Sequence, residues 1–197
     1  MPPSPFAMLR RRRHAIHALV VLASLTGAQA AQAVVLDFED LICARTQPTC
    51  HVGSVYASKG YTLRYAAAPD DDHPVGFQAI GKLWTPDAGG STAMLANSCN
   101  ASTVLTAQSG KPFSVLALDL AEANADAPVT VEFIGTKTDG TQVRMNAPLD
   151  GKPGWQRVVF PSAFYNLKTL TWLQGDCISN KSHMFDNILV MPGIAPR

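Results

Sequence analysis

Short segments in which apolar and polar residues alternate make up most of this chain, and turn residues separate each segment from the next. No stretch shows a helical period, whereas a period of two puts apolar side chains on one face of a strand. Many short strands separated by turns are typical of antiparallel sandwiches. We therefore predict one all-β domain, an antiparallel β-sandwich of the jelly-roll type. Strands are expected at residues 34–38, 61–66, 76–83, 92–96, 102–107, 113–120, 129–134, 141–145, 155–160, 169–173 and 184–190.

One connection between these strands is clearly signalled. Asp139-Gly140 lies between two alternating segments and favours a β-hairpin with a type I′ turn. The segment 118–127 could hold a helical turn, but Pro128 opens the next strand directly after it. We interpret 118–127 as a loop.

The first 33 residues have the layout of a secretory signal peptide. A basic run from Arg10 to Arg13 precedes an apolar stretch, and small residues with two A-x-A cleavage sites follow. The apolar stretch is shorter than the roughly 18 residues that a membrane span requires. We expect residues 1–33 to be removed, residues 34–193 to form the domain and residues 194–197 to be a tail of a secreted or periplasmic protein.

Removal of this leader changes the charge of the chain. The leader holds four arginines and no acid, so the rest keeps twelve Lys and Arg against fifteen Asp and Glu, a formal charge of −3. A mildly acidic protein without a basic stripe does not suit nucleic acid, whose binding depends on neutralising phosphates. We expect no nucleic-acid partner and no membrane association after cleavage.

Four cysteines follow the leader, at Cys43, Cys50, Cys99 and Cys177. An even number in an exported chain indicates disulfides. Three pairings are open, and we favour Cys43 with Cys50, which closes a small loop, and Cys99 with Cys177, which joins distant segments. Zinc is the weaker alternative because the spacing is not C-x-x-C.

Acidic residues gather at the end of the first expected strand. Within residues 34–40 the apolar side chains share one face, so Asp37 and Glu39 lie on the other face and Asp40 follows them. Near the other end of the chain, the spacing of Asp186 puts it on the same face as the apolar residues at 188 and 190. If that face is buried, Asp186 is a carboxylate at the rim of the core.

The first and last strands of a sandwich often lie adjacent, which would bring Asp186 toward Asp37, Glu39 or Asp40. Carboxylate oxygens that converge with backbone carbonyls are the ligands that calcium prefers. We therefore predict a structural calcium ion held by these acids. The alternative is that the acids accept hydrogen bonds from turn amides and bind no ion.

Motifs spread over the chain resemble those of known exported domains. "LDFEDL" near the start and "FDNILV" near the end enclose "GYTLRY", "KPFSVLALDLAEA" and "VTVEFIGTKTDGTQV" in order. This arrangement resembles bacterial jelly-roll domains of the PEP-CTERM-associated type, galactose-binding-like carbohydrate-binding modules and, more loosely, MAM domains. The resemblance implies a structural calcium held by Glu39 and Asp186, with Asp37 or Asp40 as a further ligand. The chain lacks the sorting tail of PEP-CTERM proteins, so we expect a soluble exported product.

Carbohydrate is the most specific partner that such a sandwich suggests. Sugar binding requires exposed aromatic rings beside polar groups. Trp84, at a strand end against a Pro- and Gly-rich loop, is the leading candidate, and Tyr56, Tyr65 and Trp155 are further candidates. We predict a polysaccharide or glycan partner.

Two functions from different classes remain open. The first is a non-catalytic exported module that binds carbohydrate in the extracellular matrix or cell envelope, with an ion fixing its strand ends. The second is a structural or protein-interaction sandwich without a small-molecule site, whose protein partner the sequence does not identify. A polysaccharide-active hydrolase or lyase ranks third, because no G-x-S-x-G motif or other catalytic arrangement is visible.

Overall fold

A computed structural model describes residues 32–41, 46–69, 75–81, 91–98, 100–123, 129–174 and 182–193. The chain divides into two compact units, Met1–Ala30 and Ala31–Arg197, and every described residue belongs to the second. Nearly all of the predicted signal peptide and the whole predicted tail lie outside the described residues, so both stay predictions. No helix in the described ranges is long and apolar enough to cross a membrane.

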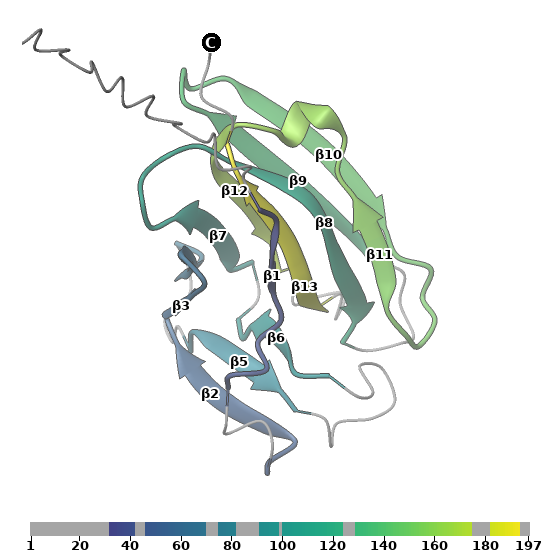
Figure 1. Ribbon diagram of the computed structural model, residues 1–197. Coiled ribbons are helices and arrows are strands. Elements are labelled where there is room, and N and C mark those ends of the chain that lie inside the picture. The colour runs from purple at the N-terminus through teal and green to yellow at the C-terminus, as the bar shows by residue number, and fades with distance from the viewer. Residues whose placement is uncertain are drawn as a thin grey trace, which may run out of the picture. The chain divides into compact units, whose positions relative to one another are not determined.

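The described residues form 13 strands, all paired antiparallel, and one turn of 3-10 helix at Ser162–Phe164 (Figure 1). The strands are β1 (Val34–Leu36), β2 (Thr49–Gly53), β3 (Val55–Ser58), β4 (Tyr61–Ala66), β5 (Phe77–Ile80), β6 (Ala93–Ala96), β7 (Ser102–Ala107), β8 (Phe113–Glu122), β9 (Thr130–Lys137), β10 (Gln142–Pro148), β11 (Gln156–Val159), β12 (Leu167–Leu173) and β13 (His183–Pro192).

Strand pairing arranges these elements in two layers. In the β13 layer the order is β2-β5-β6-β13-β8-β11, and β1 pairs with the second half of β13. In the β12 layer the order is β3-β4-β7-β12-β9-β10. The layers join where Leu167 of β12 pairs with Phe113 of β8. The predicted antiparallel β-sandwich is confirmed.

Aromatic side chains from the two layers pack against one another in the core. The ring of Trp172 in β12 lies 5.1 Å from that of Phe185 in β13, at an angle of 90°. The ring of Tyr65 in β4 lies 5.9 Å from that of Phe77 in β5. Each T-shaped pair contributes about 0.5–1.5 kcal/mol beyond the area that it buries. These contacts hold the layers face to face.

The first and last strands lie side by side, as the sequence predicts (Figure 1). Val34 pairs with Val190, and Leu36 pairs with Ile188. The strand ends at Leu36 rather than at residue 38, because the backbone of Phe38 turns into the left-handed region with a φ of 52°. This pairing brings the acidic end of the first strand beside β13.

Some local expectations are wrong. β8 continues to Glu122, so residues 118–122 are strand rather than loop. The sequence does not signal β2 and β3, which meet at a bend where Gly53, the last residue of β2, has a φ of 101°. The hairpin at Asp139-Gly140 is confirmed, but only Gly140 has a positive φ and its N–H donates to the Lys137 carbonyl. The turn is therefore type I followed by a bulge rather than type I′.

Candidate functional site

Asp186 faces away from the core, contrary to the predicted alternation. Asn187 has a φ of 49°, and the pairing of β13 with β8 shifts between Asp186 and Leu189, which defines a β-bulge. Phe185 and Ile188 therefore both face the core, and Asp186 lies on the opposite face of the layer. Its side chain is still only 1% exposed.

Two further carboxylates lie near Asp186, and we call Glu39, Asp119 and Asp186 the acidic cluster. Asp119 of β8 is the direct cross-strand partner of Asp186. Burial is the main cause that raises the pKa of Asp186 to about 7, and the charges of Asp119 and Glu39 add to it. Hydrogen bonds from Ser91 and from the Asn187 N–H act in the opposite direction. The fold thus holds a buried carboxyl group among other carboxylates.

Polar neighbours fix the members of the acidic cluster. The Thr92 N–H donates to Glu39 Oε1 over 2.9 Å. Arg157 Nη1 lies 2.9 Å from Asp119 Oδ1, and Asn187 Nδ2 donates to Asp119 Oδ2 over 3.0 Å. Asp186 makes no ion pair with a described residue. This arrangement favours a proton or a bound cation at Asp186.

The predicted metal ligands have different surroundings in the structure. Glu39 lies near Asp186, whereas Asp37 and Asp40 are engaged elsewhere. Asp37 Oδ2 lies 3.0 Å from Lys59 Nζ, and Asp40 Oδ1 accepts a hydrogen bond of 2.5 Å from the Tyr56 hydroxyl. Within the described ranges, no group of three or more His, Cys, Asp or Glu side chains is placed to hold a metal ion.

Asp119 is the member of the acidic cluster that the sequence analysis missed. It is the only charged residue in the segment 113–121, which is apolar apart from Ser114. A single acid inside an apolar strand was the signal that could have identified it, because such a carboxylate needs a specific partner.

The described aromatic residues predicted to bind sugar do not form an exposed platform. Tyr56 and Tyr65 are 6% and 7% exposed and belong to the core, which corrects their predicted role. Burial and the hydrogen bond to Asp40 raise the pKa of Tyr56. Trp155 is half-buried against a small apolar cluster that includes Met184. Trp84 lies outside the described residues, and its role stays a prediction.

Cys50 is disulfide-bonded. It lies in β2, where it pairs with Ala79 of β5 at the edge of the β13 layer. Cys43, Cys99 and Cys177 lie outside the described residues, so the predicted connectivity stays a prediction.

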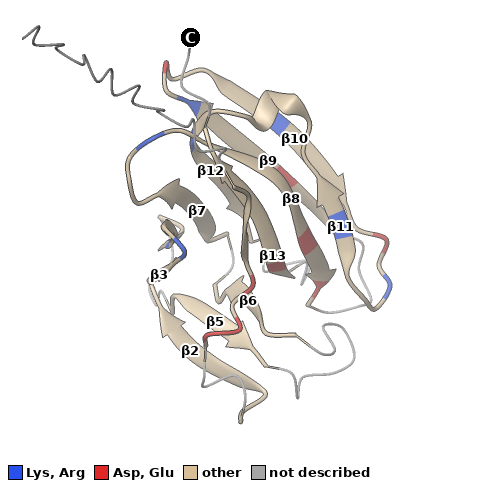
Figure 2. Cartoon of the chain, viewed as in Figure 1, with Lys and Arg blue, Asp and Glu red and all other residues tan. Residues whose placement is uncertain are grey.

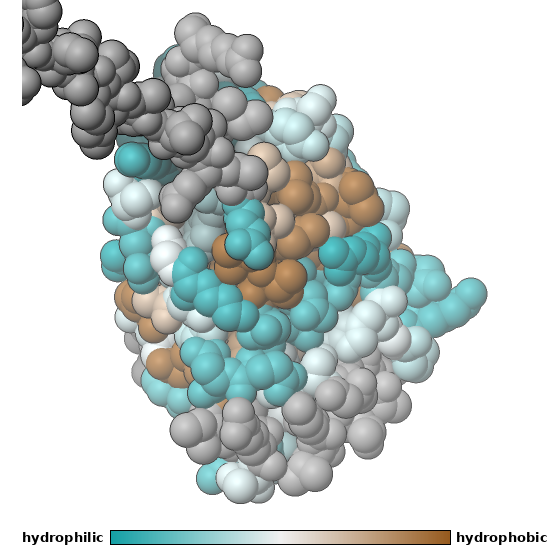
Figure 3. Space-filling view, viewed as in Figure 1, coloured by the Kyte–Doolittle hydropathy of each residue, from teal (hydrophilic) through white to brown (hydrophobic). Residues whose placement is uncertain are grey.

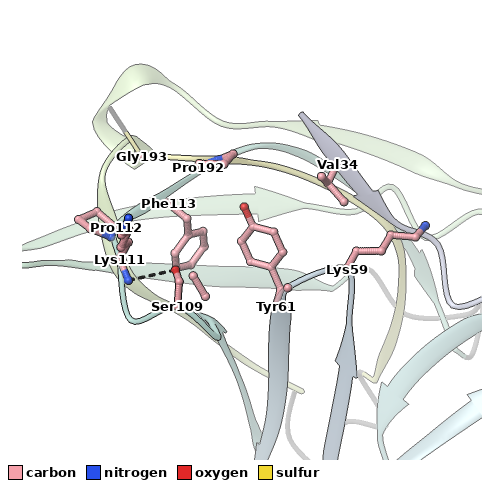
Figure 4. A pocket seen from close by; sticks show the side chains of 11 residues that line it. Val34, Lys59, Tyr61, Ser109, Lys111, Pro112, Phe113, Pro192 and Gly193 are labelled. Carbon is pink, nitrogen blue, oxygen red and sulfur yellow. Dashed lines mark hydrogen bonds between the residues drawn. The ribbon is translucent and has the colours of Figure 1, made fainter. Parts of the chain in front are cut away.

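A pocket of about 270 Å³ opens at the end of the sandwich where β1 begins and β13 ends (Figure 4). The β3–β4 turn and the β7–β8 loop complete its wall. The rings of Tyr61 and Phe113 pack at 5.7 Å within the lining. Lys59 and Lys111 lie on opposite sides of the Tyr61 ring in Figure 4. We call this the end pocket.

Two backbone features shape the end pocket. Lys59 and Gly60 have φ values of 49° and 84°, as a type I′ turn between β3 and β4 requires. At the opposite wall, the Gly193 N–H donates to the Pro112 carbonyl over 2.8 Å. A Cβ at Gly193 would lie 2.6 Å from the Pro112 oxygen, so only glycine permits this close approach.

The end pocket combines an apolar interior with hydrogen-bond donors at its rim. Burial raises the pKa of Tyr61, so its hydroxyl stays protonated at neutral pH. Ser109 adds a hydroxyl group, and the two lysines add ammonium groups. The lining that the structure describes contains no Asp or Glu. Such a site can hold a small ring that is apolar on one face and polar at its edge.

Sequence analysis missed the residues of the end pocket. They come from segments that are far apart along the chain, at residues 34, 59–61, 107–113 and 192–193. The Lys59-Gly60 turn carried a local signal, since a glycine between alternating segments favours a hairpin. Nothing in the sequence indicated that the four segments converge.

Comparison with known proteins finds only distant structural likeness. No protein-family model and no curated protein sequence matches the chain. Two mutants of a family 29 carbohydrate-binding module, CBM29-2, share 12% identity with it at a TM-score of 0.37, covering 82% of this chain and 85% and 91% of theirs.

A further structure in this comparison is a family 11 carbohydrate-binding module from Clostridium thermocellum, in complex with a beta-1,3-1,4-mixed-linked tetrasaccharide. It shares 8% identity at a TM-score of 0.35, covering 85% of this chain and 99% of that one. Likeness at this level assigns no ligand and no family to the chain. The resemblance to PEP-CTERM-associated proteins and MAM domains stays a prediction.

Proposed function

We propose that this protein is a non-catalytic exported β-sandwich module that binds carbohydrate in its end pocket. The observation that carries the proposal is the composition of that pocket, in which partly exposed valine and proline side chains lie beside hydroxyl and ammonium donors, while the rings of Tyr61 and Phe113 in the lining are only 5% and 0% exposed. A sugar ring presents C–H groups to an apolar wall and hydroxyl groups to such donors. Pockets for drug-sized ligands measure about 300–1,000 Å³. A pocket of about 270 Å³ therefore suits one sugar ring better than a long chain.

The burial of Asp186 supports the non-catalytic part of the proposal. Glycoside hydrolysis uses two carboxyl groups that flank the scissile bond. Asp119 and Asp186 are adjacent carboxyl groups, and the pKa of Asp186 is raised as a general acid would require. Asp186 is only 1% exposed, however, so a polysaccharide cannot reach it in this conformation.

A blocked pocket tests this function. In Ser109→Trp a large ring enters the end pocket from an exposed loop without disturbing the core. Lys152→Trp is the matched control, because Lys152 is exposed beyond the opposite end of β8, where Gly151 contacts Glu122. We expect the wild type and Lys152→Trp to bind sugars in an array of neutral and acidic oligosaccharides, and Ser109→Trp to bind none. Equal binding by both variants would contradict the assignment.

We also propose that a calcium ion stabilises the strand ends at the acidic cluster. Asp186 and Glu39 would each offer a carboxylate to the ion, and backbone carbonyls or water would supply the remaining hard oxygen ligands that calcium prefers. An ion there would offset the repulsion that, with burial, raises the pKa of Asp186.

Thermal unfolding tests the ion separately from the sugar. We expect the Tm to rise when millimolar calcium replaces chelator, because a ligand that binds only the folded state stabilises it. Asp186→Asn should abolish this rise. Asp139→Asn, which alters an exposed acid in the β9–β10 turn, should retain it. A wild-type Tm that does not respond to calcium would refute the ion and leave the acids as turn-capping groups.

An apolar row on the β13 layer favours the alternative, a protein-interaction module. Val35, Leu189, Ala117 and Val159 are successive cross-strand neighbours on its outer face. Val159 is 70% exposed and Val35 is 38% exposed. Figure 3 shows hydrophobic side chains gathered over β1 and β8. Exposed apolar patches of this kind mark binding surfaces for other proteins.

A change at Val159 distinguishes the alternative. Val159→Glu should leave sugar binding intact if the end pocket is the functional site. Loss of self-association or of a co-purifying protein in Val159→Glu, together with no sugar binding by the wild type, would favour the interaction module instead.

A further inference from the structure

We propose that the sugar recognised in the end pocket is acidic and that Lys111 binds its negative group. This inference rests on the proposed carbohydrate function and names the class of ligand within it. The negative group is a carboxylate or a sulfate on the sugar ring, since an ammonium ion recognises both as a point charge.

The two lysines of the end pocket differ in their charge balance. Lys59 Nζ lies 3.0 Å from Asp37 Oδ2 and donates to the Val35 carbonyl over 2.8 Å, so its charge is compensated. Lys111 forms no ion pair with any described residue. Because no Asp or Glu is among the described residues that line the pocket, the ammonium group of Lys111 can form an ion pair with a bound ligand.

The loop that carries Lys111 is held by local hydrogen bonds. The Gly110 N–H donates to the Ala107 carbonyl over 3.0 Å, and Gly110 has a φ of 67°. The Lys111 N–H donates to Ser109 Oγ over 3.3 Å (Figure 4). These bonds place the Lys111 backbone at the rim before any ligand arrives, so binding need not order the loop.

The charge distribution of the molecule also favours an acidic ligand at this site. Figure 2 shows acidic residues on β8, on β13 and on the chain that follows β1. Glu39, Asp119 and Asp186 belong to this group, whereas the lining of the end pocket carries lysines alone as charged residues. A negatively charged saccharide is repelled by the first region and attracted by the second.

Matched pairs of sugars test this inference. We would titrate the full-length mature protein with oligogalacturonides and with the same oligomers after methyl esterification, which removes the charge but keeps the ring. Sulfated and unsulfated galactan oligomers form a second pair. Lys111→Gln is the test variant, and Lys152→Gln, at an exposed lysine beyond the other end of β8, is the control.

We expect the wild type and Lys152→Gln to bind at least one charged member more tightly than its neutral partner. Lys111→Gln should lose about fivefold to tenfold in affinity for it, because a hydrogen bond to a charged group is lost at a partly solvated site. Affinity should also fall as salt rises. The pair that shows the preference identifies carboxylate or sulfate as the negative group.

Three results would overturn the inference, and they differ in what they leave standing. Equal affinity for charged and neutral members, unaffected by Lys111→Gln, would refute the acidic ligand but retain the carbohydrate function. Binding to none of the four oligomers would refute the acidic ligand, and together with an array without any hit it would refute the carbohydrate function as well. An equal loss in Lys111→Gln and Lys152→Gln would show nonspecific attraction and also refute the role of Lys111.

Discussion

Asp186 combines burial with negative neighbours, and this makes stability depend on pH. Its pKa is about 7 in the folded protein against 3.8 ordinarily, so the folded state binds more protons than the unfolded chain between these values. The free energy of unfolding should therefore fall as pH rises from about 4 to about 7. Three pKa units correspond to about 4 kcal/mol at most.

His183 acts in the opposite direction, so the wild-type curve alone is not diagnostic. Burial lowers the pKa of His183 from 6.5 to about 4, and the folded state therefore binds fewer protons than the unfolded chain between these values. The contribution of His183 to stability rises with pH over this window. The contribution of Asp186 must be taken as a difference between two proteins.

Asp186→Asn isolates this contribution. In chelator, the variant should gain stability relative to the wild type as pH rises from 4 to 8, by about 2–4 kcal/mol over the range. Urea unfolding at each pH measures this difference. Glu132→Gln, at an exposed acid on β9, should show no such trend. A difference between wild type and Asp186→Asn that does not change with pH would contradict the buried, repelled carboxyl group.

At the scale of elements, the contact between β2 and β5 depends on Gly76. A Cβ at this position would lie 2.8 Å from the backbone C and O of Gly53, and the φ of Gly76 is 93°. Gly140 has a similar φ of 87° in the β9–β10 turn, but its Cβ would meet nothing within 4 Å. Substituting each glycine therefore distinguishes the loss of stability caused by a backbone clash from the loss caused by a positive φ alone.

Alanine at each position tests this distinction. Gly140→Ala should lower the free energy of unfolding by about 1–2 kcal/mol, through its φ alone. Gly76→Ala should lower it by at least about 3 kcal/mol, because Gly53 must also move. Chemical denaturation measures both. Equal losses would show that the close approach of the two strands is not needed for the fold.

Strands were predictable from the sequence where alternation is regular. Tyr61–Ala66 and Ser102–Ala107 agree with prediction at both ends, since their apolar residues occupy every second position. The bulge at Asn187 was not predictable from the sequence. Asn187 has a φ of 49° and reverses the alternation of buried and outward-facing side chains, but no glycine at this position indicates a positive φ. As a result, the predicted face of Asp186 was wrong even though its strand was right.

At the scale of the whole molecule, Phe185 connects the two layers. Its buried ring packs against those of Phe38, Phe77 and Trp172. Phe185→Ala should lower the free energy of unfolding by about 3–5 kcal/mol, because it opens a cavity between the layers. Tyr165→Ala, at a ring that is 38% exposed, should change it by about 0.5 kcal/mol. If Phe185→Ala lowered the free energy of unfolding by no more than Tyr165→Ala does, the proposed packing of Phe185 between the layers would be contradicted.

The sandwich and the adjacency of its two ends followed from the sequence, but the end pocket did not. Alternation indicates which residues face inward, and the expectation that terminal strands lie adjacent placed β1 beside β13. The end pocket depends on where the β3–β4 turn meets the β7–β8 loop. That meeting is set by the packing of the two layers, which no local pattern encodes.

The most direct test of carbohydrate binding in the end pocket is an amide chemical-shift titration of the mature protein with neutral and acidic oligosaccharides. We predict saturable shifts confined to the pocket residues, above all Gly60, Tyr61, Lys111 and Gly193, and their loss in Ser109→Trp. Shifts centred on Val35 and Val159 instead, or no shifts with any sugar, would contradict the assignment of this pocket as the binding site.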